Sequence, residues 1–378
     1  MNGDGSPSTS GIQGGTGSPA RGRGRFATHD YRPRHGIPVR AGERWVAVVA
    51  LVALVFGGGW LVTRLAHVNP VNVREQEWWL DPLKIPQAQQ LTRGEGVTVA
   101  LVDSGVDPTR PDLAGQLLPG TTFGEAPPSP LASTDPRLHG TEMAGLIAGK
   151  GGGATHLLGI APGAKILPIM LVMDSDGKYF ARDTDEAIRW AADHGAKVIN
   201  LSLGRSGAAS PLEVDAIRYA FSKDAVVVAA AGNVSDDDRD GNVIAPANIP
   251  GVVAVAGTAP SGAWDGATHG PEVVVAAPAA KLISTVPTAY HSNGFDVVYG
   301  TSGATAITSG VVALIRSRYP QLDAANVINR LIRTAKDEGT PGRDPIFGFG
   351  IIRPLEALTL SVPPVSSNPL LTGVSAPR

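Results

Sequence analysis

The stretch Gly-Val-Thr-Val-Ala-Leu-Val-Asp-Ser-Gly, residues 96–105, decides the fold of this chain. A continuous apolar run that ends in an acidic residue and a glycine is typical of a buried parallel strand followed by a tight turn. Four further apolar runs follow, and helix-like segments alternate with them. This alternation predicts an α/β fold with a mostly parallel sheet and helices on both faces. The predicted strands are 97–102, 166–172, 198–203, 226–230 and 252–256, and the predicted helices include 140–148, 183–193 and 211–222.

Three short motifs place an acid, a base and a nucleophile along this pattern. Asp103 directly follows its strand, His139 begins His-Gly-Thr-Glu-Met-Ala-Gly, and Ser302 lies in Gly-Thr-Ser-Gly-Ala at the start of a predicted helix. Strand ends and helix starts meet at one edge of a parallel sheet, so these side chains are expected to converge. The order Asp, His, Ser is one of the orders in which an acyl-transfer triad is assembled. Ser302 is the expected nucleophile, His139 the general base and Asp103 its orienting carboxylate.

A fourth motif, Ala-Ala-Ala-Gly-Asn, ends at Asn233 and supplies a side-chain amide that could stabilise an oxyanion. Each residue also has a plain structural interpretation when taken alone. Ser302 fits a helix N-cap, Asp103 a turn residue and Asn233 a left-handed turn residue. The presence of all four together favours catalysis.

With these motifs in this order, the chain resembles the subtilisin-like serine proteases, the subtilases, from about Trp78 to about Ala357. The resemblance implies a three-layer subtilisin-like fold and an endopeptidase that acts on protein or peptide substrates. It also implies two substrate-binding segments. One is an edge that pairs with extended peptide, and the other is a wall of the pocket for the side chain before the scissile bond. These segments are Leu201, Ser202, Leu203 and Gly204, and Ala230, Ala231 and Gly232.

Two segments depart from the family pattern, one after Ser302 and one after His139. The family usually follows its serine with a bulky residue and then Ala-Ala-Pro, where this chain has Gly303, Ala304, Thr305 and Ala306. Glu142 stands where the family often has a second histidine or a small residue, and its carboxylate is expected to raise the pKa of His139.

The alternative function is a weak or inactive subtilase that binds peptide as a scaffold in a membrane secretion complex. An α/β-hydrolase esterase is excluded, since it needs Gly-x-Ser-x-Gly and the order Ser, Asp, His.

The N-terminal part of the chain predicts a membrane-anchored protein. Residues 1–44 are basic and rich in Gly, Ser and Pro, which predicts disorder. Residues 45–62 carry no charge and predict one transmembrane helix, a signal anchor; a cleaved signal peptide and a buried helix are the alternatives. The anchor predicts a single-pass protein of the cell membrane with its catalytic domain outside the cytoplasm. The predicted order continues with a lead-in at 63–90, a catalytic domain at 91–360 and a disordered tail at 361–378.

The lead-in contains Glu77-Trp78-Trp79-Leu80-Asp81-Pro82-Leu83, which resembles the N-terminal segment of the mycosins, membrane subtilases of type VII secretion. The likeness implies a secretion-system partner. Little more than 30 residues separate the predicted anchor from the Asp103 strand, too few for a folded inhibitory pro-domain of the usual subtilase size. Mycosins generally carry their anchor at the C-terminus, so the N-terminal anchor is a difference.

Composition excludes several other kinds of site. The net charge of −2 gives no reason to expect a nucleic-acid partner, and the absence of cysteine excludes disulfides, a thiol nucleophile and cysteine metal sites. Asp236-x-Asp238-x-Asp240-Gly241 begins like a calcium loop, but its twelfth position is Ala247 instead of glutamate. A solvated acidic loop is therefore the favoured interpretation, with calcium binding as the alternative, and no cofactor is expected.

Overall fold

The computed structural model describes residues 68–124, 135, 137–172, 181–234 and 241–371. The predicted N-terminal disorder at 1–44, the predicted transmembrane helix at 45–62 and the acidic loop at 235–240 lie outside these residues. Within the described part of the chain, no helix is both long and apolar enough to cross a membrane.

An eight-stranded sheet forms the middle layer of the domain. Its order is β2-β3-β1-β4-β5-β6-β7, and β8 pairs with β6. Every pairing is parallel except that of β6 with β7. The strands are β1 (Thr98–Asp103), β2 (Thr121–Phe123), β3 (Lys165–Leu171), β4 (Val198–Leu201), β5 (Val226–Ala230), β6 (Val253–Ala259), β7 (Gly262–Ala263) and β8 (Val275–Pro278); β9 (Leu282–Thr285) and β10 (Phe295–Val298) form a separate antiparallel pair.

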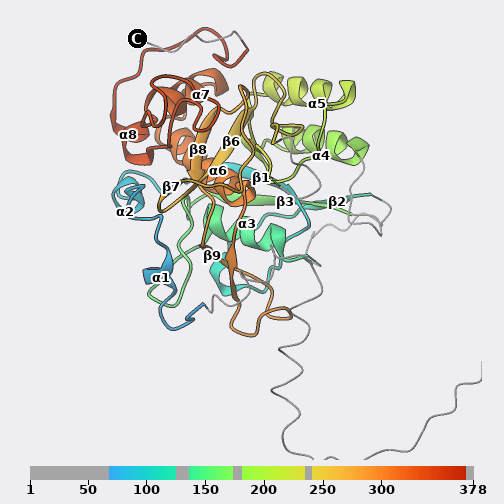
Figure 1. Cartoon of the computed structure of the whole chain (residues 1–378). Coiled ribbons are helices and arrows are strands. Elements are labelled where there is room, and N and C mark those ends of the chain that lie inside the picture. The colour runs from blue at the N-terminus through green and yellow to red at the C-terminus, as the bar shows by residue number, and fades with distance from the viewer. Residues whose placement is uncertain (1–67, 125–134, 136, 173–180, 235–240, 372–378) are drawn as a thin grey trace, which may run out of the picture. The chain divides into compact units, whose positions relative to one another are not determined.

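Helices cover both faces of this sheet (Figure 1). On one face α3 packs against α6, which runs beneath β4, β5, β6 and β8, and α4 packs against α5 on the other. The sequence-based prediction of a three-layer α/β fold is therefore confirmed. The helices are α1 (Val73–Gln76), α2 (Ile85–Ala88), η3 (Pro111–Leu113), α3 (His139–Ala148), α4 (Ala181–Asp193), α5 (Pro211–Ser222), α6 (Thr301–Arg318), α7 (Ala324–Arg333) and α8 (Pro354–Thr359).

Strand β4 is shorter than its apolar pattern predicts. The run 198–203 indicates a strand to Leu203, but β4 ends at Leu201. The next residue, Ser202, forms hydrogen bonds with Ser302 of α6 instead of with a neighbouring strand. Its carbonyl oxygen accepts from the Ser302 hydroxyl, and its own hydroxyl donates to the Ser302 carbonyl oxygen. The chain therefore leaves the sheet where it meets the buried helix.

The tail from residue 361 also differs from its prediction as disordered. Up to residue 371 it lies against α7 and the turn before β6. Asn329 donates a hydrogen bond to the carbonyl oxygen of Pro363 (2.8 Å), and Val365 donates one to the side-chain oxygen of Asn326 (2.8 Å). Asn368 bonds the carbonyl oxygen of Gly251 (3.0 Å). Asparagine side chains thus satisfy backbone groups that the Pro-rich segment cannot pair in a helix or sheet.

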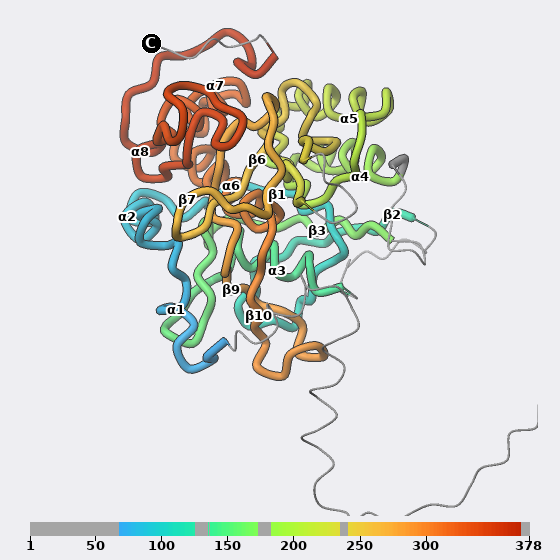
Figure 2. Tube along the Cα trace, viewed as in Figure 1, coloured from blue at the N-terminus to red at the C-terminus, as the bar shows by residue number. Residues whose placement is uncertain are grey.

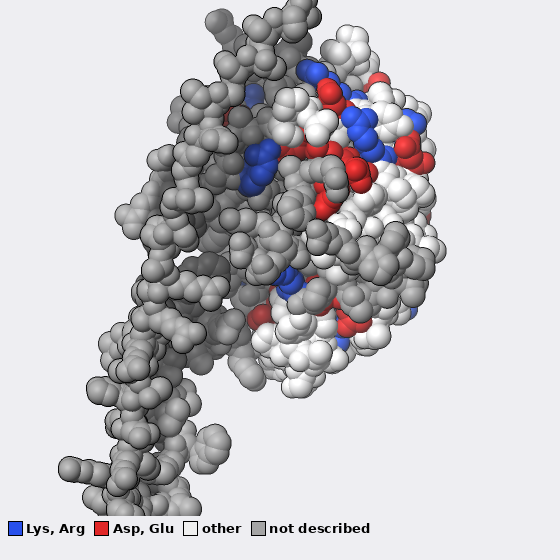
Figure 3. Space-filling model, turned by 90° about the vertical axis from the view of Figure 1, so that its right-hand side faces the viewer, with Lys and Arg blue, Asp and Glu red and all other residues white. Residues whose placement is uncertain are grey.

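Charged side chains of both signs are interspersed on the face shown in Figure 3. The ion pairs of α4 and α5 include Lys223 with Asp193 (2.9 Å) and Arg218 with Asp215 (3.6 Å). Such a mixed distribution creates no extended field of one sign over these two helices.

The lead-in segment packs into the domain through Glu77 and its neighbours. The side chain of Trp79 is 1% exposed, and the indole of Trp78 donates a hydrogen bond to the carbonyl oxygen of Ala280 (3.1 Å). Glu77 is buried, pairs with Arg74 (2.9 Å) and accepts the backbone N–H of Leu158 (3.0 Å). Burial raises the pKa of Glu77 to about 8, against the opposing effect of Arg74.

We predict that Glu77→Gln makes the domain less sensitive to alkali. A carboxyl whose pKa is higher in the folded chain contributes stability that is present below its unfolded pKa and is lost as the pH rises through its folded pKa. For Glu77 that loss falls between about 4.5 and about 8. Between about pH 5 and about pH 9, the Tm of Glu77→Gln should therefore fall by roughly 2–4 °C less than that of the parent chain. The exposed neighbour Glu75→Gln is the matched control, and an equal fall in all three chains would contradict the prediction.

Candidate active site

The four candidate catalytic residues all lie where strands end or helices begin. Asp103 is the last residue of β1, and Asn233 follows β5. His139 is the first residue of α3, and Ser302 is the second residue of α6. Because β1, β4 and β5 are adjacent parallel strands, their carboxyl ends share one edge of the sheet (Figure 1). The contact between Asp103 and His139 and the bond between Ser302 and Ser202 place these residues along that edge.

Asp103 and His139 form a direct pair. The distance from Asp103 Oδ1 to His139 Nδ1 is 2.8 Å. The Asp103 side chain is 4% exposed, whereas the imidazole is 35% exposed. A buried carboxylate at Nδ1 fixes the ring orientation and leaves Nε2 as the nitrogen that can exchange a proton.

Ser104 and Asp135 hold this pair in place, and the sequence analysis did not identify either. The backbone N–H of Ser104 donates to Asp103 Oδ1 (2.7 Å), and its hydroxyl donates to Asp135 (2.8 Å). Asp135 also accepts the backbone N–H of Thr141 (2.7 Å), and Gly140 donates to the Ser104 oxygen (3.0 Å). Ser104 was visible as the middle residue of Asp-Ser-Gly, but Asp135 stands in no motif.

Gly140 is required because α3 starts against the turn after β1. A Cβ atom at this position would lie 1.9 Å from the carbonyl oxygen of Gly105. The glycine therefore allows His139 to approach Asp103 from a neighbouring element.

The charges around His139 favour its protonated form. Burial alone would lower the pKa of His139, but the Asp103 carboxylate and its hydrogen bond raise it to about 9. Glu142 and Asp135 add to this effect. The predicted influence of Glu142 thus has the expected direction. Burial also raises the pKa of Glu142 to about 8, while His139 opposes this rise and Asp296 adds to it.

The hydroxyl of Ser302 is held against the end of β4. Ser302 Oγ donates to the carbonyl oxygen of Ser202 (3.0 Å), and Ser202 Oγ donates to the carbonyl oxygen of Ser302 (2.9 Å). Among the residues that the structure describes, the Ser302 hydroxyl bonds Ser202 and not His139. Catalytic hydrogen bonds are often absent or long before substrate binds.

Asn233 is oriented by the residue before Ser302. Its Oδ1 accepts the backbone N–H of Thr301 (2.9 Å) and the Thr301 hydroxyl (3.0 Å). With Oδ1 committed in this way, Nδ2 remains as the donor group. The backbone N–H of Gly232 in turn donates to Thr301 Oγ1 (3.2 Å). The sequence analysis did not identify Thr301 as this link.

Gly303, which departs from the family pattern, is explained by its neighbour. A Cβ atom on Gly303 would lie 2.5 Å from Leu282 Cδ1, at the start of β9. The leucine therefore occupies the space into which a larger residue after Ser302 would project. Ala306 is buried within α6.

The two predicted substrate segments lie beside the same edge. Leu201 ends β4, and Ser202, Leu203 and Gly204 lead away from it toward residue 245, where Arg205 and Ala245 form an antiparallel bridge. Ala230 ends β5, Ala231 and Gly232 lead from it to Asn233, and all three are buried. Gly232 has φ +116°, a conformation that favours glycine.

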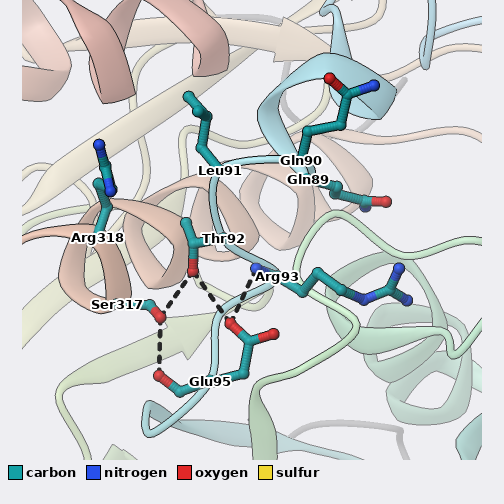
Figure 4. A pocket seen from close by; sticks show the side chains of 8 residues that line it. All are labelled: Gln89, Gln90, Leu91, Thr92, Arg93, Glu95, Ser317 and Arg318. Atoms are coloured by element: carbon teal, nitrogen blue, oxygen red, sulfur yellow. Dashed lines mark hydrogen bonds between the residues drawn. The ribbon is translucent and has the colours of Figure 1, made fainter.

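A polar cavity of about 470 Å³ lies at the other end of α6 from Ser302 (Figure 4). Its polar groups bond one another: Thr92 donates to Ser317 (2.8 Å), and Ser317 donates to the carbonyl oxygen of Glu95 (2.8 Å). An 18-residue helix is about 27 Å long, so this cavity lies far from the triad. It is lined by Gln89, Gln90, Leu91, Thr92, Arg93, Glu95, Ser317 and Arg318.

Within the described ranges, no group of three or more histidine, cysteine, aspartate or glutamate residues is placed to hold a metal ion. The candidate calcium loop around Asp236, Asp238 and Asp240 falls outside those ranges.

A parallel three-layer sheet, an aspartate–histidine pair and a serine at a helix start together define the class of α/β serine hydrolases. The sequence also matches the family described as "Subtilase family" over residues 94–350. The chain belongs to the subtilase family, which confirms the resemblance seen in its motifs.

Known relatives support the same assignment. The chain is 34% identical over 304 residues to fervidolysin of Fervidobacterium pennivorans, covering 73% of this chain and 42% of that protein. It is 31% identical over 335 residues to mycosin-1 of Mycobacterium tuberculosis, covering 76% and 74%. A solved structure of the serine protease MycP1, described as an essential component of the type VII (ESX-1) secretion system, is similar with a TM-score of 0.66. That structure is 31% identical, and the match covers 79% of this chain and 91% of that one.

We predict an alkaline working range from the electrostatics of His139. Only the neutral imidazole can accept a proton from Ser302, and the raised pKa of about 9 keeps this form scarce at neutral pH. The value of kcat/KM for a peptide amide should therefore rise between about pH 7 and about pH 9 instead of levelling off near pH 7. Initial rates across that range, with Ser302→Ala as the background, measure the rise; a plateau reached by neutral pH would contradict it.

Proposed function

We propose that this chain is a serine endopeptidase that hydrolyses peptide bonds through Asp103, His139 and Ser302. The observation that carries the proposal is the 2.8 Å contact between Asp103 and His139 at the sheet edge where α6 presents Ser302. Membership of the subtilase family and similarity to fervidolysin and mycosin-1 support it.

The first half of the reaction forms an acyl-enzyme. Ser302 Oγ attacks the substrate carbonyl carbon while its proton passes to His139 Nε2, and Asp103 stabilises the resulting imidazolium. The negative charge that develops on the carbonyl oxygen is stabilised by Asn233 Nδ2 and by the backbone N–H of Ser302 at the start of α6. His139 then gives the proton to the leaving amine, and the C–N bond breaks.

The second half uses water as the nucleophile. His139 takes a proton from the water, the hydroxyl attacks the acyl carbon, and the proton returns to Ser302 Oγ as the ester bond breaks. This chain's own residues supply every proton transfer, so the proposal needs no metal or cofactor. Peptide pairs with the edge formed by Leu201, Ser202, Leu203 and Gly204, and its side chain before the scissile bond lies beside Ala230, Ala231 and Gly232.

The proposal extends to where the enzyme acts. Residues 45–62 support a single membrane anchor and an extracytoplasmic catalytic domain, on the strength of their uncharged sequence. Similarity to MycP1 supports a role beside a secretion complex. Protease protection of intact and lysed cells tests the location, because a cytoplasmic domain would be digested only after lysis.

A fluorophosphonate probe tests the catalytic proposal directly. The full-length chain in detergent should gain the mass of one probe less that of the HF released as the serine oxygen displaces fluoride, and Ser302→Ala should gain none, since only an activated serine reacts. A folded parent chain that stays unlabelled would instead favour the alternative function, a peptide-binding scaffold.

We predict that Asn233→Asp lowers kcat by about 10²–10³ or more with little change in KM. The aspartate keeps an oxygen that can accept from Thr301 but replaces the Nδ2 donor with a second oxygen. Asn69→Asp is the matched control, because Asn69 is exposed and its side-chain oxygen accepts a local backbone N–H, that of Val71 (3.1 Å). Activity of Asn233→Asp equal to that of this control would rule out Asn233 as an oxyanion donor.

A further inference from the structure

Glu142 is a buried carboxyl beside the proposed general base. It lies one turn after His139 on α3, and the residue is only 6% exposed to solvent. Within the described part of the chain, no group donates a hydrogen bond to its carboxylate. Its charged neighbours are His139 and the carboxyl groups of Asp296, Asp135 and Asp103. A buried carboxylate without a hydrogen-bond donor is costly, and three like charges nearby add to that cost.

The second carboxyl group comes from the facing hairpin. Asp296 lies on β10, whose partner β9 packs against α3 (Figure 2). The hydroxyl of Ser284 on β9 donates to the carbonyl oxygen of Glu142 (2.6 Å) and joins the hairpin to the helix. The Asp296 side chain is 35% exposed; it lies 3.3 Å from His291 and accepts the backbone N–H of Val297 (2.7 Å). Glu142 and Asp296 therefore lie on two elements that face each other at the edge of the active site.

This place is the leaving-group side of the proposed reaction. His139 gives its proton to the leaving amine, so the residue after the scissile bond must pass close to the imidazole. The preceding part of the substrate is expected along residues 201–204, at the end of β4. Helix α3 and the β9–β10 hairpin therefore border the residue that follows the scissile bond.

We propose that Glu142, with Asp296 facing it, binds a cationic side chain on the substrate residue that directly follows the scissile bond. The enzyme would then favour arginine or lysine at that position. The inference rests on the proposed function, because it assumes that peptide is cleaved beside His139. A guanidinium or ammonium group would supply the hydrogen-bond donors that the Glu142 carboxylate lacks among the described residues, and its positive charge would lie between two carboxyl groups. The raised pKa of Glu142 agrees with this unfilled requirement.

The test compares two quenched fluorescent peptides that differ only after the scissile bond, one with arginine and one with citrulline. Citrulline has nearly the same shape as arginine but no charge. At about pH 9, where Glu142 is largely ionised, the parent enzyme should show a kcat/KM about tenfold higher for the arginine peptide. In Glu142→Gln the ratio should fall to about one. Glu75→Gln, an exposed glutamate on the lead-in, should keep the parent ratio.

A ratio near one in the parent enzyme, or an unchanged ratio in Glu142→Gln, would overturn the proposal. The ratio separates specificity from a simple effect on His139, because a change in the general base alters the rates for both peptides equally. A cooperative thermal unfolding transition in Glu142→Gln would show that the substituted chain folds.

Binding to the Ser302→Ala chain separates this proposal from the proposed function. Titration calorimetry with the same two peptides should show arginine favoured about tenfold in Ser302→Ala and no preference in Ser302→Ala with Glu142→Gln. Equal binding of both peptides to Ser302→Ala would reject the cation site even if hydrolysis occurs. Preferential binding of the arginine peptide without hydrolysis by the parent chain would support the site and reject only the catalytic proposal.

Discussion

Two hydrogen bonds that run in opposite directions between Ser202 and Ser302 tie the end of β4 to the start of α6. The connection continues into the core, since Asn200 donates to Ser202 Oγ (2.9 Å) and accepts from Ser309 (2.8 Å). Helix α6 is buried along most of its length. The position of the proposed nucleophile is therefore set by the interior of the domain, and the edge proposed to receive substrate is fixed to it by the same bonds.

The acid–base side of the site depends on a crowded set of carboxyl groups. Asp103 orients the imidazole, Asp135 secures the turn and the first residues of α3, and Glu142 adds negative charge one turn further along. These groups make His139 a stronger base than a free histidine. The same crowding leaves one of them, Glu142, without a donor among the described residues, so the electrostatics that favour catalysis at alkaline pH also create a place for a positive charge.

Local sequence patterns were sufficient to predict much of this arrangement. Asp103, His139, Asn233 and Ser302 could be identified because each lies in a short motif at the end of a strand or the start of a helix. Asp135 could not, because it joins the site through the fold and stands in no repeated pattern. The tail beyond residue 361 was predicted as disordered from its composition, since its partners on α7 are distant in sequence. The contact between Leu282 and the Gly303 position likewise depends on tertiary structure and could not be predicted from local sequence.

The lead-in contributes to the core, and this moves the effective border of the domain. The family match begins at residue 94, yet Trp79, Leu80, Leu83 and Ile85 are already buried. Lys84 forms an ion pair with Glu356 of α8 (2.8 Å), so early and late parts of the chain close on each other. A fragment that began at the family boundary would leave a large apolar surface open to water and would tend to associate with itself. A unit able to fold alone thus includes the lead-in, whose burial begins at Val68 within the described part of the chain.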